Sequence, residues 1–235
     1  MNWKLLKGSH EFPGPDGGTC INEAAVVAAG LPYRLIERPD DCPPCFSRVL
    51  ASYAIQLNDG MDNDIRQELL IPFVVRMANT ADVEAVERRR AAYMLVEYVR
   101  RILSILQEAD GYFDIAKQCR AVVEVADCFD LLESMKAVSP SAADICSVYV
   151  DVNIPKMARR PEFMAMAAGK AVTSATLQCK QWKKEFFSIA CRILDEAIRL
   201  GNHGPLDAEV AVERLKAAML DASDLVGVGV TEKAA

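Results

Sequence analysis

Apolar residues recur every three to four positions through most of the 235-residue chain, and this spacing predicts an all-α protein. In the stretch 45–58, for example, Val49, Leu50, Tyr53 and Leu57 would share one helix face. Glycines, prolines and capping residues separate the periodic stretches. We expect about seven to nine helices, at roughly 20–29, 45–58, 63–72, 80–109, 112–137, 141–150, 161–200 and 207–222. The only candidate strand is a short one at 33–36.

Local signals suggest where individual helices begin and end. Thr19 is the expected N-cap of the first helix, because its hydroxyl can accept a hydrogen bond from a free backbone N–H of the first turn. Pro72 is expected to end or kink the third helix. Gly169 is a candidate interruption of the long pattern at 161–200.

A region rich in proline, near residues 138–160, is the best candidate for a domain boundary. It predicts an N-terminal helical domain at 1–138, which carries an irregular Gly/Pro/Cys segment, and a C-terminal helical region at 139–226. Residues 227–235 read as a disordered tail.

The bulk composition is that of a folded protein, with 51% hydrophobic and 26% charged residues. No apolar run approaches the roughly 20 residues that cross a bilayer, and the N-terminus shows no apolar core of a signal peptide. We therefore expect a cytoplasmic protein without membrane contact, whose eight cysteines are reduced.

Charge is distributed unevenly along the chain. The stretch 156–192 carries eight basic and two acidic residues, whereas the rest has a net charge of −12. Such asymmetry favours a non-enzymatic binding protein whose basic C-terminal face engages an acidic protein or nucleic acid. The candidate partner-binding residues are Lys170, Lys180, Lys183, Lys184, Arg192, Arg159 and Arg160. Trp182 and Phe186, in the same stretch, fall on the expected buried stripe.

The arginines of the helix expected at 80–109 alternate with glutamates. Arg88, Arg89 and Arg90 follow Glu84 and Glu87 at helical spacing. We interpret this cluster as a solvated helix face with ion pairs three and four residues apart, in preference to an anion site.

The irregular N-terminal segment holds the one sharp motif, Cys42-Pro43-Pro44-Cys45, and three interpretations of it stay open. His10, Cys20, Cys42 and Cys45 could form a Cys3His zinc site, with zinc as a candidate cofactor. Alternatively, a thiol at a helix start could make the protein a thiol- or metal-dependent enzyme or redox protein centred on Cys20, Cys42 and Cys45. Finally, the motif could simply begin a helix. No catalytic signature decides between them, and no catalytic residue is proposed.

The phrases SHEFPGPDGGTCINEAAVVAAG, DDCPPCFS, YAIQLNDGM and RQELLIPFVVRMANT cover roughly the first third of the chain. In these phrases the chain resembles a family of uncharacterised proteins of bacteria and their phages. That family has no known activity, so the resemblance implies no site residue. It implies a small protein that acts by binding a host machine, such as a defence complex.

Overall fold

The computed structural model describes residues 3–12, 18–135, 160–201 and 207–228. Counting the uninterrupted helix from Glu84 to Ala109 once, these residues form nine helices and no strand, which confirms the all-α prediction. The helices are α1 (Ile21–Ala28), α2 (Arg48–Gly60), α3 (Asn63–Val74), α4 (Glu84–Tyr98), α5 (Ser104–Ala109), α6 (Phe113–Ala121), α7 (Val125–Met135), α10 (Pro161–Gln178), α11 (Lys183–Arg199) and α12 (Ala208–Val228). Two 3-10 turns, Pro39–Asp41 and Lys180–Trp182, and a π-helical turn, Val99–Leu103, complete the described elements.

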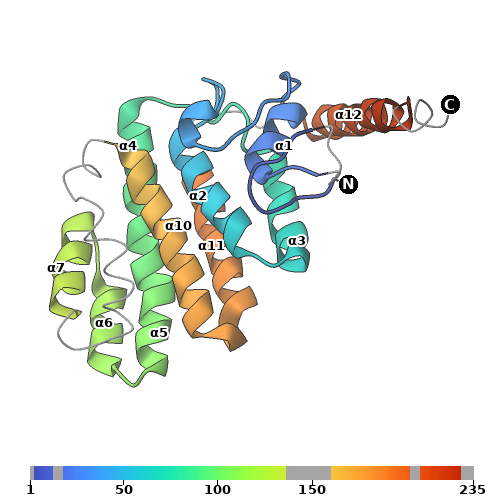
Figure 1. The fold of residues 1–235 in the computed structure, drawn as a ribbon. Coiled ribbons are helices and arrows are strands. Elements are labelled where there is room, and N and C mark those ends of the chain that lie inside the picture. The colour runs from blue at the N-terminus through green and yellow to red at the C-terminus, as the bar shows by residue number, and fades with distance from the viewer. Residues whose placement is uncertain (1–2, 13–17, 136–159, 202–206, 229–235) are drawn as a thin grey trace.

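Four long helices form the centre of the molecule. Helix α10 packs against both α2 and α4, and α11 packs against the same two helices from the other side (Figure 1). Helices α6 and α7 lie beside the α4–α5 helix, whereas α1 and α3 lie at the opposite side, next to α2 and α11. Helix α12 touches α1 and projects away from the body of the protein.

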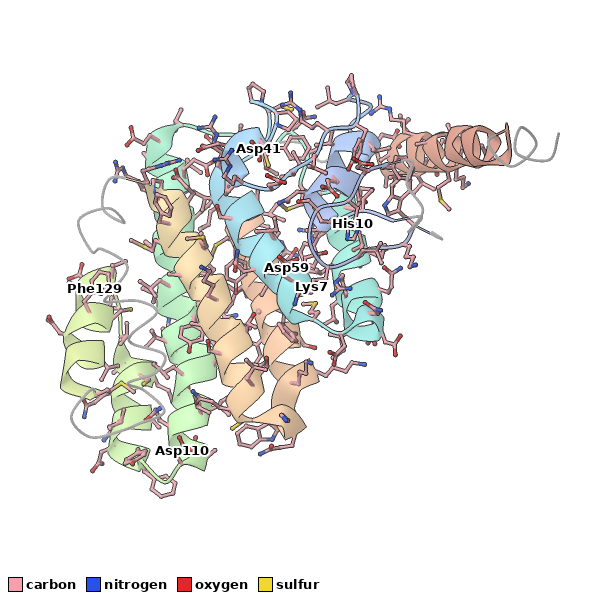
Figure 2. All side chains as sticks on the ribbon, viewed as in Figure 1. Lys7, His10, Asp41, Asp59, Asp110 and Phe129 are labelled. Carbon is pink, nitrogen blue, oxygen red and sulfur yellow. The ribbon has the colours of Figure 1, made fainter. Side chains whose placement is uncertain are left out.

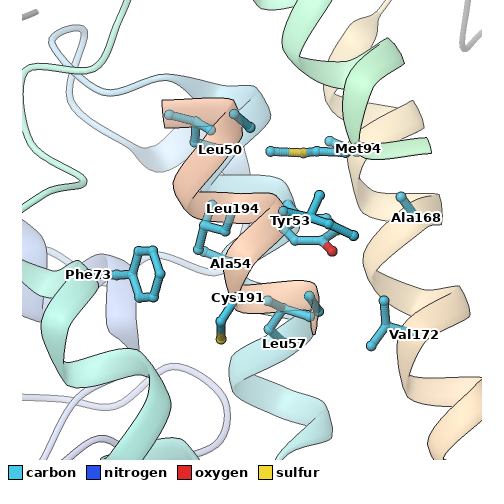
Figure 3. Packing of buried hydrophobic residues seen from close by; sticks show 14 of the residues in the cluster. Leu50, Tyr53, Ala54, Leu57, Phe73, Met94, Ala168, Val172, Cys191 and Leu194 are labelled. Carbon is cyan, nitrogen blue, oxygen red and sulfur yellow. The ribbon is translucent and has the colours of Figure 1, made fainter. Parts of the chain in front are cut away.

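The core fills the space between these central helices. Figure 3 shows Tyr53 and Leu57 of α2 between α11, which carries Leu194, and α10, which carries Val172. All four side chains are buried. None of the described helices is long and apolar enough to cross a lipid bilayer.

Gly169 does not interrupt α10, contrary to one reading of the sequence, and instead lets two helices approach closely. A Cβ atom added there would lie 2.7 Å from Cβ of Gln56 and 3.2 Å from the carbonyl oxygen of Tyr53, both on α2. Such a contact is shorter than normal van der Waals separation, so the missing side chain determines how closely α10 packs on α2.

The first helix has a different cap from the predicted one. Cys20, and not Thr19, is the N-cap of α1, and its Sγ accepts the backbone N–H of Glu23 at 3.5 Å. The Glu23 carboxylate accepts the N–H of Cys20 in return, which completes a capping box. The Thr19 hydroxyl instead accepts the indole N–H of Trp3 at 2.9 Å.

Two further element predictions were wrong, and the expected end of the third helix was two residues early. Residues 33–36 form no strand, since the described backbone there is irregular. Pro72 lies inside α3, which continues to Val74. The helix expected at 112–137 is two helices, because the backbone leaves helical geometry at Val122 and the Asp127 carboxylate accepts the N–H groups of Val123 and Glu124 before α7.

The long pattern at 161–200 also forms two helices and not one. α10 ends at Gln178, the chain turns at Cys179, and α11 begins at Lys183, so the two helices pack against each other. Because both carry apolar stripes of the same period, the sequence pattern runs through the turn without a break. Phe186 is buried as expected, whereas Trp182 is only partly buried beside it.

Residues on both sides of the predicted domain boundary belong to one hydrophobic cluster. The boundary region 138–160 and the helix expected at 141–150 lie almost wholly outside the described residues, so the division at 138/139 stays a prediction. Helix α12 continues to Val228, beyond its expected end near residue 222 and into the first two residues of the expected tail.

Candidate functional site

A buried carboxylate organises the irregular N-terminal segment. Glu23 is fully buried, and its side chain accepts the backbone N–H groups of Cys20 at 2.8 Å, Ile36 at 3.2 Å and His10 at 3.4 Å. Burial raises the pKa of Glu23, although each of these hydrogen bonds acts to lower it. The side chain thereby ties two irregular segments, one before α1 and one after it, to the start of that helix.

Aromatic packing supports the same segment. Phe12 lies between Trp3 and Tyr33, with ring centroids 5.1 and 5.6 Å apart. The Tyr33 hydroxyl donates to the carbonyl oxygen of His10, and Ser9 Oγ donates to that of Ile36 at 2.5 Å. These contacts order the segment without the apolar periodicity of a helix.

Two of the four predicted zinc ligands, Cys20 and His10, make other contacts in the structure. Cys20 caps α1, and Nε2 of His10 lies 2.8 Å from the carbonyl oxygen of Lys7. Figure 2 shows His10 well apart from Asp41, the neighbour of Cys42 at the N-terminal end of α2. In the described part of the chain, no group of three or more His, Cys, Asp or Glu side chains is placed to hold a metal ion. Zinc binding by His10, Cys20, Cys42 and Cys45 stays a prediction, which elemental analysis of untagged protein tests.

Two thiols of the segment, those of Cys20 and Cys42, lie in surroundings that disfavour the reactive thiolate. Burial raises the pKa of Cys42 to about 12, and burial together with the nearby Glu23 carboxylate raises that of Cys20. Cys45 is half-buried against the core. A catalytic cysteine needs a lowered thiol pKa, so the surroundings of Cys20 and Cys42 argue against either of them as a reactive thiol.

The Cys-Pro-Pro-Cys motif leads into a helix. Cys42 follows the 3-10 turn, and the backbone N–H of Phe46 donates to the carbonyl oxygen of Pro43 at 2.9 Å. Ser47 then caps α2, since its Oγ accepts the N–H of Leu50 at 3.1 Å. The helix therefore begins at Arg48, three residues later than predicted.

The predicted basic face is partly neutralised by acidic residues from other elements. Lys183 pairs with Asp62 at 2.7 Å, and Lys184 pairs with Glu68 at 2.8 Å. Arg160 contacts two carboxylates, and Arg159 lies outside the described residues. Lys170, Lys180 and Arg192 are exposed.

A cleft of about 360 Å³ opens where the 3-10 turn, α2 and the start of α10 meet. Its apolar wall includes Pro39, Ile55, Phe163 and Met166. Four carboxylates, from Glu37, Asp40, Asp59 and Glu162, also line it, against the two arginines Arg38 and Arg160. Figure 2 shows Asp59 towards the far end of α2 from Asp41, so the cleft follows much of that helix.

Ser52 of α2 also lines the cleft, and its hydroxyl lacks a partner. The residue is 1% exposed, and its Oγ makes no hydrogen bond with any of the described residues. A buried hydroxyl without a partner loses its hydration without compensation. A polar ligand group that reached this oxygen would supply the missing hydrogen bond.

Arg160 connects this cleft to a second hollow. A hollow of about 440 Å³, lined by Phe46, Arg48 and Glu84 among others, shares Arg160 and Glu162 with the cleft. The Arg160 guanidinium donates to Asp40 at 3.1 Å and to Glu162 at 2.5 Å. We call the cleft and the hollow together the Arg160 groove.

Sequence reasoning missed this site. Asp40 and Arg160 are 120 positions apart, and no periodic pattern links the 3-10 turn to the start of α10. Arg160 was identified as a binding residue, but for a basic face, whereas the groove around it contains more acidic than basic side chains. The only available signal was the excess of acidic residues outside 156–192.

Comparisons of the chain with protein-family models, with curated proteins and with solved structures found no match.

Proposed function

We propose that this chain is a non-enzymatic binding protein and that the Arg160 groove receives a linear segment of its partner. The observation that carries the proposal is the unpartnered, buried Ser52 hydroxyl in a cleft with an apolar wall. Binding sites combine such a wall with a few polar groups that orient the ligand. The raised thiol pKa of Cys42 supports binding over thiol chemistry.

A peptide display experiment tests this proposal. The wild-type protein is panned against a random peptide library, in parallel with Met166→Trp, which fills the cleft, and Met164→Trp. Met164 is a matched control, because it is half-buried on the same helix and lines neither the cleft nor the hollow. We expect the wild type and Met164→Trp to enrich the same peptides and Met166→Trp to lose them. Enrichment that survives Met166→Trp, or no enrichment at all, contradicts the proposal.

The basic residues support a second candidate, an acidic protein or nucleic acid as partner. Lys170, Lys180 and Arg192 are exposed, and no ion pair reaches them within the described parts of the chain. Binding at these residues would weaken with rising salt, because it depends on charge. Reversing the charge of Lys170 and Lys180 should reduce the salt dependence of binding to an acidic ligand. An affinity that ignores both salt and these lysines excludes this candidate.

The resemblance of the first third of the chain to bacterial and phage proteins is compatible with a partner bound at the Arg160 groove and with one bound at the exposed basic residues. It places the partner in a bacterial host and stays a prediction.

A further inference from the structure

The groove already holds one guanidinium group, that of Arg160. This group donates to carboxylates on two different elements, Asp40 of the 3-10 turn and Glu162 of α10. It also lies over the ring of Phe163, 4.9 Å from the ring centroid. Two carboxylates and an aromatic face are the groups that recognise arginine, which stacks on rings and donates to carboxylates through a planar fork.

Arg160 does not saturate the acidic groups of the cleft. Among the described residues, no cation pairs with Glu37 or with Asp59, although Oδ1 of Asp59 accepts the backbone N–H of Gly8 at 2.8 Å and the side-chain amide N–H of Asn58 at 3.0 Å. The Ser52 hydroxyl is a third unused polar group in the same cleft, and it is buried. A cation that entered the cleft would therefore meet acceptors besides those that Arg160 uses.

The shape of the site favours an extended ligand over a small free amine. The aliphatic stem of an arginine would pack on the apolar wall formed by Ile55 and Met166. A small amine would occupy only the cleft, whereas the second hollow, which shares Arg160 and Glu162 with it, offers room for neighbouring residues of a peptide.

Resting on the proposed function, we infer that the groove recognises an arginine in an extended segment of a partner protein, and that Arg160 occupies this arginine's place in the free protein. The partner's guanidinium would displace Arg160 from Asp40, which also pairs with Arg48 at 3.2 Å, and from Glu162, and it would stack on Phe163. Arg160 is thus an internal competitor, and its side chain is 44% exposed. Exposed ion pairs change an equilibrium constant by about fivefold or less, so displacement of Arg160 is readily reversible.

Fluorescence anisotropy with labelled heptapeptides tests the inference. The peptides share an alanine and glycine backbone and carry arginine, lysine, glutamine or glutamate at the central position. We expect the arginine peptide to bind most tightly, lysine less tightly, and glutamate not at all. Arg160→Met should tighten arginine-peptide binding by about twofold to fivefold, since it removes the competitor. Glu37→Gln should weaken it, and provides a second arm if Arg160→Met is poorly folded.

Arg199→Met is the matched control. It changes the net charge equally and breaks an exposed ion pair with Asp195, but Arg199 lines neither the cleft nor the hollow, so the affinity should not change. Weaker or unchanged binding by Arg160→Met overturns the inference. The inference also fails if the glutamine and arginine peptides bind the wild type equally well. If Met166→Trp then abolishes the binding of both peptides, the proposed function still stands. If no peptide shows binding that depends on Met166, the proposed function fails as well.

Discussion

Replacing Arg90 with leucine should destabilise the protein strongly, whereas the same change at Arg88 of α4 should cost little. The Arg90 side chain is 0% exposed. It donates to the Glu87 carboxylate at 2.7 Å, to the carbonyl oxygen of Thr80 at 2.7 Å and to that of Ala197 at 3.2 Å. Ala197 lies in the last turn of α11, so one guanidinium joins α4 to the end of a second central helix.

The magnitude follows from what the substitution leaves behind. Glu87 is only 14% exposed. Without Arg90 its carboxylate would lose its ion pair and retain one side-chain hydrogen bond, which the Ser47 hydroxyl donates at 2.5 Å. Removing one member of a buried ion pair typically costs about 3–5 kcal/mol. For a chain of this size the melting temperature should therefore fall by roughly 6–20 °C.

Urea unfolding of matched variants measures this loss. Arg88→Leu is the control, because Arg88 is 46% exposed and pairs with Glu84 on the surface, where a pair is worth about 1 kcal/mol or less. Arg90→Leu combined with Glu87→Gln should be more stable than Arg90→Leu alone, since it removes the stranded charge. A loss below about 1 kcal/mol for Arg90→Leu, equal to that of Arg88→Leu, would refute the reasoning.

Three further predictions concern other buried groups. The pKa of Glu23 is raised from 4.5 in the folded state, so its contribution to stability is present below pH 4.5 and is lost as the pH rises through the folded pKa. Urea midpoints measured against pH should therefore fall less steeply for Glu23→Gln than for the wild type, whereas equal slopes would contradict the assignment. Cys42, with a pKa of about 12, should react with iodoacetamide at pH 8 about a thousandfold more slowly in the native protein than after unfolding. Mass spectrometry of the labelled peptide measures both rates. Rapid labelling of the native protein would contradict the prediction and favour a reactive thiol at Cys42. Gly169→Ala should gain about 1 kcal/mol of stability from helix propensity but lose about 1–3 kcal/mol through steric overlap with Gln56. The urea midpoint should therefore stay level or fall. A clear rise would show that α10 is not in close contact with α2 at this position.

The positions of the helices were largely readable from the sequence. The regular spacing of Val49, Leu50, Tyr53 and Leu57 predicts α2, because a helix that buries one face needs apolar residues every three to four positions. The start of α2 was misplaced by three residues, since Ser47 acts as a cap only through the geometry of its backbone. Periodicity also could not separate α10 from α11, as both helices bury stripes of the same period on either side of Cys179.

The roles of the charged residues were decided by the tertiary structure. Arg88 and Arg90 look alike in the sequence, and both were expected on a solvated face, yet only Arg90 meets the end of α11 and becomes buried. Glu23 similarly finds its hydrogen-bond donors at His10 and Ile36, thirteen residues away on either side. Pairing of this kind depends on which elements pack together.

The Arg160 groove has the same origin. Its carboxylates come from the 3-10 turn, α2 and the start of α10, and each one alone would be an ordinary surface charge. The sequence by itself determined an all-α chain with an uneven distribution of charge, because helix formation and net charge depend on local composition. Only the packing of α10 against α2 decided that acidic side chains would surround Arg160 and that Ser52 would be buried without a partner, because both depend on contacts between residues more than one hundred positions apart.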